Sequence, residues 1–143
     1  MPSWILKVAT ARNVLLGAIE PGDTALLGTF GRLAGEAGAN PELEKAGLLP
    51  PSPDQPDADR RRPTDVYLPS WFGGVPAALD LAITSPQRQD TFADAAVHVG
   101  AAAEAYELYK RSDLNTEADC RAQGIAFVPL VAETSGGWGP YAR

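Results

Sequence analysis

Two aspartates lie in the middle of the chain, each within a short stretch of strand-forming apolar residues. Asp65 belongs to PTDVYL, and Asp80 follows fifteen positions later in AALDLAIT. Aspartate is disfavoured in strands, because its side chain competes for backbone hydrogen bonds and loses solvation when it is buried. Two of them on adjacent strands would form a carboxylate pair, and such pairs hold hard divalent cations against phosphate groups. The alternative is that each aspartate caps a turn or lies at a strand edge.

A lysine farther along the chain is a third candidate. The alanine-rich stretch 90–111 predicts one long helix. Its apolar residues recur at helical spacing and are Phe92, Ala96, Val99, Ala103 and Tyr106. Continuing that spacing reaches Lys110, which lies in line with the stripe at the C-terminal end of the helix. Lys110 would either reach into a site or be a solvated residue that the helix dipole favours.

The rest of the pattern predicts the elements that position these residues. A helix is expected from Asp23 to a stop at Gly38, a short strand in PELEKAGLL, and a hairpin of the two aspartate strands joined by PSWFGGVP. A short helix closed by Gly124 and a buried strand in GIAFVPLVAE follow the long helix. This order predicts a mixed α/β layer with helices packed against a sheet. After the last strand, Glu133 and TSGGWGP form either a plain turn or a site border where glycines let the backbone approach a phosphate.

Length and composition limit the architecture. The chain has 143 residues, enough for one domain with a core, and its 13 prolines and 14 glycines indicate long irregular segments. We expect a mobile Pro-rich loop at about 50–62, ending in Arg60, Arg61 and Arg62. These arginines are either solvated or placed to hold a DNA backbone. The formal net charge of −6 argues against a wholly basic nucleic-acid-binding surface and leaves a local one open.

Cysteine content and hydropathy bear on the compartment. A single cysteine, Cys120, cannot form an internal disulfide, which favours a reducing environment. The sequence has no run of about 18 apolar residues and no secretion signal, so we expect an intracellular, soluble protein without a membrane partner. Residues 1–22 are expected to form an N-terminal extension, and residues 23–143 the domain.

Taken in order, these segments resemble a known family. The segments that carry the resemblance are PELEKAGLL, RRRPTDVYLP, AALDLAITS, an alanine-rich helix ending AYELYKR, and GIAFVPLVAETSGGWGP. With them the chain resembles the restriction-endonuclease-like nuclease domain of non-LTR retrotransposons, a branch of the PD-(D/E)xK nucleases. The resemblance runs from about residue 23 to the C-terminus and rests on order and spacing more than on any one motif. It implies an αβββαβ core, a mixed central sheet flanked by helices, and an isolated or truncated copy of the domain that acts in the nucleus.

The resemblance also implies site residues. Asp65 corresponds to the PD element, with Thr64 between its two letters, and Asp80 to the acidic residue of the next strand. Two positions after Asp80, where this family's simplest motif has lysine, the chain has Ala82. In the retrotransposon branch that lysine is displaced onto the following helix near a tyrosine, which matches Lys110.

Further residues would have accessory roles under the same resemblance. Tyr106 and Tyr109 match the tyrosine that accompanies the displaced lysine. Glu36 resembles an accessory acidic residue that some of these nucleases use, and Glu44 is a competing candidate for that role.

The implied function is a DNA endonuclease that depends on Mg²⁺ or Mn²⁺. Asp65 and Asp80 would hold the cation, and Lys110 would stabilise developing charge or orient the attacking water. The arginines at 60–62 would contact the DNA. The alternative is a catalytically inactive relic that serves as a DNA-binding or assembly domain.

Overall fold

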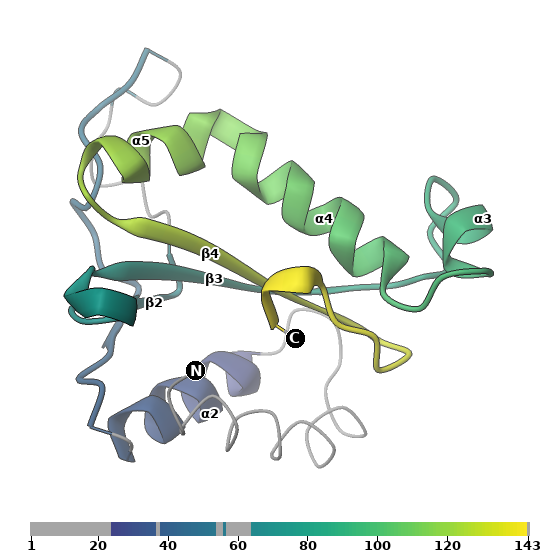
Figure 1. Cartoon of the computed structure of the whole chain (residues 1–143), viewed down its shortest axis with the longest axis horizontal. Coiled ribbons are helices and arrows are strands. Elements are labelled where there is room, and N and C mark those ends of the chain that lie inside the picture. The colour runs from purple at the N-terminus through teal and green to yellow at the C-terminus, as the bar shows by residue number, and fades with distance from the viewer. Residues whose placement is uncertain (1–23, 37, 54–55, 57–63, 143) are drawn as a thin grey trace.

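The computed structural model describes residues 24–36, 38–53, 56 and 64–142, which form a four-stranded sheet with helices on both sides (Figure 1). The main elements in chain order are α2 (Thr24–Glu36), β1 (Glu42–Leu43), β2 (Val66–Leu68), β3 (Ala77–Thr84), α3 (Phe92–Ala95), α4 (Ala101–Ser112), α5 (Thr116–Ala122) and β4 (Ala126–Glu133). Short 3-10 turns follow at Phe72–Gly74, Asp113–Asn115 and Pro140–Ala142. The expected extension at 1–22, most of the loop at about 50–62, and the arginines at 60–62 lie outside the described residues.

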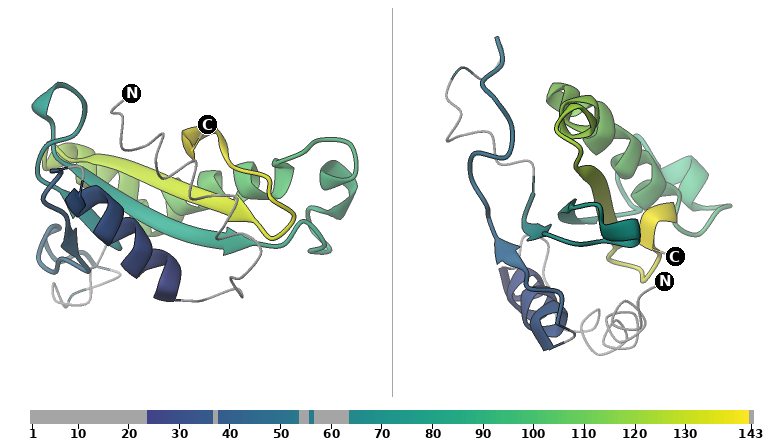
Figure 2. Two further views of the ribbon diagram at one scale, coloured as in Figure 1. Left: turned by 90° about the horizontal axis from the view of Figure 1, so that it is seen from below. Right: turned by 60° about the vertical axis from the view of Figure 1, so that its left-hand side comes forward.

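The strands lie in the order β1-β2-β3-β4. Strand β2 is antiparallel to both β1 and β3, while β3 and β4 are parallel from Ala77↔Ala126 to Thr84↔Glu133. Parallel neighbours need a crossover connection, and α4 and α5 supply it. Figure 2 shows these two helices on the opposite side of the sheet from α2. The predicted mixed α/β sheet flanked by helices is therefore confirmed.

The core has two parts because side chains alternate along β3 and β4 between the faces of the sheet. On one face, Leu79 and Val128 pack with Ala34 of α2. On the other face, Ala78 and Phe127 pack with Cys120 of α5, which is fully buried. The sheet is thus held between α2 and the crossover helices, with the cysteine in a packing role.

The predicted long helix over 90–111 is wrong, because the chain forms two helices there. Gly100 adopts φ 90° between α3 and α4, a left-handed conformation that interrupts a right-handed helix. The expected stripe is broken as well, since Phe92 is 60% and Val99 78% exposed. Within α4, the spacing from the buried Ala103 to Lys110 is intact, so the placement of the lysine does not depend on the broken part.

The other predicted elements agree with the structure. The aspartate strands form the expected antiparallel hairpin, although β2 begins at Val66 and Asp65 lies in the bend just before it. The strand expected in PELEKAGLL is reduced to the two residues of β1. Gly38 and Gly124 follow α2 and α5 with φ of 76° and 72°, as expected of helix-ending glycines. Among the described residues, none of the helices has the length and apolar character needed to cross a membrane.

Candidate functional site

Asp80 lies on β3, and Asp65 lies opposite it in the bend just before β2. The register pairs Val66 with Leu79, so one further step places Asp65 opposite Asp80. The Asp65 Oδ2 atom accepts a hydrogen bond from the backbone N–H of Leu81 at 2.8 Å, which turns this carboxylate toward β3. Burial raises the pKa of Asp80, and the neighbouring Asp65 contributes to this rise. The predicted carboxylate pair is therefore present as a geometric feature.

Backbone contacts hold Asp65 in place even though it precedes β2. Its N–H donates to the carbonyl of Leu79 at 3.0 Å, and its own carbonyl accepts from the N–H of Glu44 at 2.8 Å. The preceding residue, Thr64, is only 3% exposed, and its hydroxyl lies 2.6 Å from the Val66 carbonyl and 2.8 Å from that of Leu79. The hydroxyl of Thr64 thus links the start of β2 to β3 and positions the adjacent Asp65.

Lys110 reaches the pair from α4. Its Nζ lies 2.9 Å from Asp80 Oδ2, and the two side chains are only 25% and 15% exposed. The same Nζ lies 5.7 Å from the centroid of the Tyr106 ring, within range of a cation–π contact. Tyr106 stacks in turn on Tyr109, with ring centroids 5.7 Å apart. Four of the residues predicted for the site therefore form one continuous set of contacts, with Asp65 beside Asp80.

The N-terminal end of α4 is fixed by a buried glutamate at the end of β4. Glu133 is 2% exposed, and its Oε1 accepts hydrogen bonds from the N–H groups of Ala102 at 3.0 Å and Ala103 at 3.2 Å. A carboxylate at this end of a helix is favoured because the free amides carry partial positive charge. The glycine-rich segment packs on it, since a Cβ at Gly137 would overlap Glu133 Oε2. The structure thus gives Glu133 a positioning role toward α4, which neither interpretation of this segment included.

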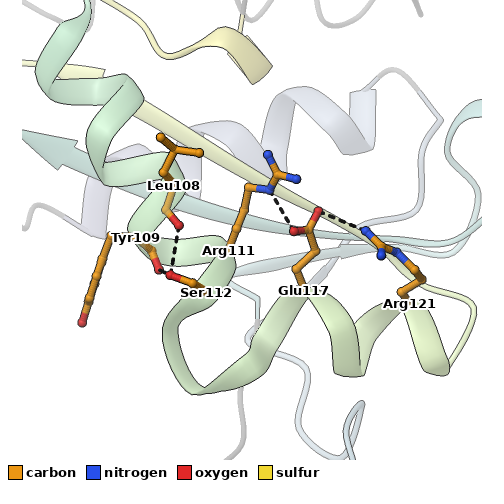
Figure 3. Close-up of polar contacts among 6 residues, drawn as sticks. All are labelled: Leu108, Tyr109, Arg111, Ser112, Glu117 and Arg121. Atoms are coloured by element: carbon orange, nitrogen blue, oxygen red, sulfur yellow. Dashed lines mark hydrogen bonds and ion pairs between the residues drawn. The ribbon is translucent and has the colours of Figure 1, made fainter.

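The C-terminal end of α4 is fixed just beyond Lys110 (Figure 3). Arg111 Nε donates to Glu117 Oε2 of α5 at 2.9 Å, and Arg121 lies 3.6 Å from the other oxygen of that carboxylate. The hydroxyl of Ser112 lies 3.1 Å from the carbonyl oxygen of Tyr109. Because α4 is held at both ends, Lys110 is presented to Asp80 by a rigid element.

Burial and charge alter the acidity of this site. Burial, opposed by the ammonium of Lys110 and reinforced by the neighbouring Asp65, raises the pKa of Asp80 from 3.8 to about 6. Burial alone would lower the pKa of Lys110, but the charge of Asp80, its hydrogen bond to Lys110 and the nearby Tyr106 and Asp65 together outweigh burial, and the net effect is a raised pKa. Lys110 is therefore protonated at neutral pH, and Asp80 is ionised above about pH 6.

The donor set fits a hard divalent cation. Mg²⁺ is usually held by one or two carboxylates together with water and phosphate oxygens, so two adjacent aspartates are sufficient protein ligands. Two like charges placed side by side also gain from a bound cation that neutralises them. Within the described part of the chain, no group of three or more His, Cys, Asp or Glu residues is arranged to hold an ion.

The remaining site predictions have different outcomes. Glu36 is exposed at the end of α2 and forms an ion pair with Arg32. Glu44 is exposed and meets Asp65 through its backbone N–H. The structure thus gives neither glutamate a side-chain contact with Asp65, Asp80 or Lys110. The arginines predicted to contact DNA are outside the described residues.

The assembled groups have the components needed for phosphate chemistry. The two carboxylates can bind a cation, and the ammonium of Lys110 can offset negative charge beside them. Sequence patterns indicated these three groups, but not the positioning roles of Thr64 and Glu133, whose contacts join segments distant in sequence. No protein-family model, curated protein or solved structure matches the chain.

Proposed function

We propose that this chain is a DNA endonuclease domain that hydrolyses phosphodiester bonds with Mg²⁺ or Mn²⁺. The observation that carries the proposal is the 2.9 Å contact between Lys110 Nζ and Asp80 Oδ2, in a half-buried site where Asp65 lies alongside. These groups come from β3, from α4 and from the bend before β2, so the fold brings together residues that are up to 45 positions apart.

Each residue has a distinct role under this proposal. Asp65 and Asp80 would hold the cation, which when bound would polarise the phosphate and make a water molecule more acidic. Lys110 stays protonated and would stabilise negative charge that develops on the phosphate oxygens. Tyr106 places its ring beside the ammonium and restricts its position. The buried setting strengthens each of these electrostatic interactions.

The order of elements supports the same assignment. With the short helices α3 and α5 set aside, the order is helix α2, strands β1, β2 and β3, helix α4 and strand β4, which is the αβββαβ order of the PD-(D/E)xK nucleases. In this comparison the lysine that the simplest motif has at position 82 is replaced by Lys110 from α4. A retrotransposon origin rests on the sequence resemblance, and DNA as the substrate follows from it.

The inactive relic is the second candidate, and one observation favours it. Lys110 already forms an ion pair with Asp80, so the site neutralises part of its own negative charge in the absence of a cation. A domain that uses the fold only to bind DNA would keep such an ion pair. The two candidates differ in whether a divalent cation produces strand cleavage.

A plasmid-nicking assay separates the two candidates. Supercoiled plasmid is incubated with purified protein and Mg²⁺, Mn²⁺ or EDTA, using wild type, Asp80→Asn and Lys110→Met. Asp94→Asn is the matched control, because Asp94 is exposed on α3. We expect metal-dependent nicking by wild type and the control, and loss of at least 100-fold in the two site variants. Nicking by Asp80→Asn at the wild-type rate would refute the endonuclease assignment, and binding without nicking by folded wild type would favour the relic.

A further inference from the structure

A pocket of about 340 Å³ lies beside the candidate site. Its walls include the end of β3 at Thr84, the segment from Arg88 to Thr91, and the α4 residues Tyr106 and Tyr109. Figure 1 shows the connection between β3 and α3 running beside the first part of α4, and residues from both segments line the pocket. This volume is at the small end of the range for ligand pockets, about 300–1,000 Å³.

The lining combines aromatic surface with a neutral polar rim. Tyr106 and Tyr109 already stack on each other, so a planar ligand can extend the stack. At the rim, Arg88 donates from Nε and NH2 to the two carboxylate oxygens of Asp90, at 3.2 and 3.1 Å. The Thr91 hydroxyl is buried in the wall and has no hydrogen-bond partner among the described residues. The pocket therefore offers stacking surface and an unused hydroxyl.

We propose that this pocket binds an unstacked nucleobase of the DNA strand whose phosphate lies at Asp65 and Asp80. A base has a planar face for the tyrosines and edge donors and acceptors for Thr91 and the Arg88–Asp90 pair. A phosphate suits the pocket less well, because it would have to compete with the carboxylate of Asp90 for the guanidinium. The neutral rim thus selects the base over the backbone.

The position of the pocket follows from the residue that it shares with the site. Tyr106 lines the pocket and also lies under the ammonium of Lys110, which contacts Asp80. Thr84 is four residues beyond Asp80 on the same strand, about 13 Å away at 3.3 Å per residue. A base in the pocket would therefore belong to a nucleotide close to the cleaved bond. This inference rests on the proposed endonuclease function and adds to it a locally single-stranded substrate.

The test measures DNA binding in EDTA, so that it does not depend on cleavage. Fluorescence anisotropy compares a labelled single-stranded 12-mer with an abasic 12-mer of the same length and charge, using wild type, Tyr109→Ala, Arg88→Ala and Leu108→Ala. Tyr109 and Leu108 are neighbours on α4 and are 53% and 58% exposed, so neither alanine opens the core. Leu108 does not line the pocket and serves as the control.

We expect wild type and Leu108→Ala to bind the intact 12-mer about tenfold more tightly than the abasic one, and Tyr109→Ala to lose most of that difference. Arg88→Ala should reduce it, since one side of the polar rim is removed. Equal affinity of wild type for both oligonucleotides, binding of neither, or full discrimination by Tyr109→Ala would overturn the nucleobase pocket. Asp80→Asn should keep the discrimination while losing nicking, so the failure of the pocket and the failure of the endonuclease assignment are seen in different measurements.

Discussion

Replacement of Asp80 by asparagine tests whether the carboxylate pair exists in solution. Asparagine keeps the size of the side chain and removes its charge. In wild type, burial and the neighbouring Asp65 raise the pKa of Asp80 to about 6, although Lys110 opposes them. The folded protein therefore binds the Asp80 proton more tightly than the unfolded chain, whose pKa for this group is 3.8. The variant lacks this titration.

The size of the effect follows from the two pKa values. A group whose pKa is raised on folding gives its full stabilisation below the unfolded value and loses it as pH rises through the folded value. For Asp80 this window extends from about pH 4 to slightly above pH 6. With one pKa unit worth about 1.4 kcal/mol, a rise from 3.8 to about 6 corresponds to about 3 kcal/mol. Lys110 does not titrate in this window, because its pKa is raised above 10.5.

The assay is urea unfolding of wild type and Asp80→Asn at several pH values between 4 and 7.5. We expect the free energy of unfolding of the variant, relative to wild type, to increase by about 3 kcal/mol between pH 4 and pH 7. Mg²⁺ at pH 7 should stabilise wild type and leave the variant unchanged, since only wild type offers both carboxylates. Asp94→Asn, at an exposed position on α3, is the control for general pH effects.

A difference in the free energy of unfolding between wild type and Asp80→Asn that does not change with pH would refute this prediction. If the free energies of wild type and Asp80→Asn change in parallel with pH to within about 1 kcal/mol, Asp80 is not buried beside Asp65 as described. Stabilisation of both proteins by Mg²⁺ would likewise place the cation elsewhere. Either outcome would remove the basis of the proposed endonuclease site.

Three further substitutions test the groups around the pair. Thr64→Val should lower the free energy of unfolding by about 1–2 kcal/mol, because the hydroxyl that bridges β2 and β3 is lost; urea unfolding measures this, and Thr64→Ser should retain most of it. Glu133→Gln should lower the thermal midpoint through a loss of about 1–2 kcal/mol, since the negative charge at the start of α4 is removed; an unchanged midpoint would contradict this role. Lys110→Met removes the charge that lowers the pKa of Asp80, so the pH window of stability loss should move above 6; an unchanged window would show that the ion pair is absent in solution.

The hairpin and the aspartate pair could be predicted from sequence because their signals are local. Each aspartate lies in an apolar stretch of strand-forming residues, and the glycines and prolines between these stretches indicate a turn. The register that places Asp65 opposite Asp80 follows from the length of that turn and from burial of the alternate residues. The local sequence pattern was therefore enough to predict that Asp65 and Asp80 lie close together.

The prediction that Lys110 lies at the site rests on an apolar stripe that is only partly present in the structure. The stripe that pointed to it was counted through Phe92 and Val99, which the structure leaves exposed. Gly100 was the only backbone signal for the break, and a glycine inside a helical pattern is often tolerated, so its positive φ could not be foreseen. The inference succeeded because the last part of the stripe, from Ala103 onward, lies within a single helix.

The positioning residues could not be predicted because their partners are distant in sequence. Thr64 bonds to a carbonyl fifteen residues away, and Glu133 to an amide thirty-one residues away. Glu107 is 2% exposed on α4 and accepts a long hydrogen bond from the N–H of Tyr141, although its sequence context is that of a solvated helix residue. Burial of such polar groups is decided by tertiary structure, which periodicity alone does not reveal.

The carboxylates of Asp80 on β3 and Glu133 on β4 differ in a way that separates structural support from function. Glu133 accepts hydrogen bonds from two helix amides and a serine hydroxyl, so its burial is compensated and it strengthens the fold. Asp80 is buried beside another carboxylate, and its raised pKa means that the folded state favours its protonated form over its ionised form. A carboxylate whose pKa is perturbed in this way is better explained by chemistry than by packing, because perturbed groups concentrate at functional sites. Asp80→Asn should therefore gain stability relative to wild type as the pH rises from 4 to 7 while abolishing nicking, and Glu133→Gln should destabilise the protein.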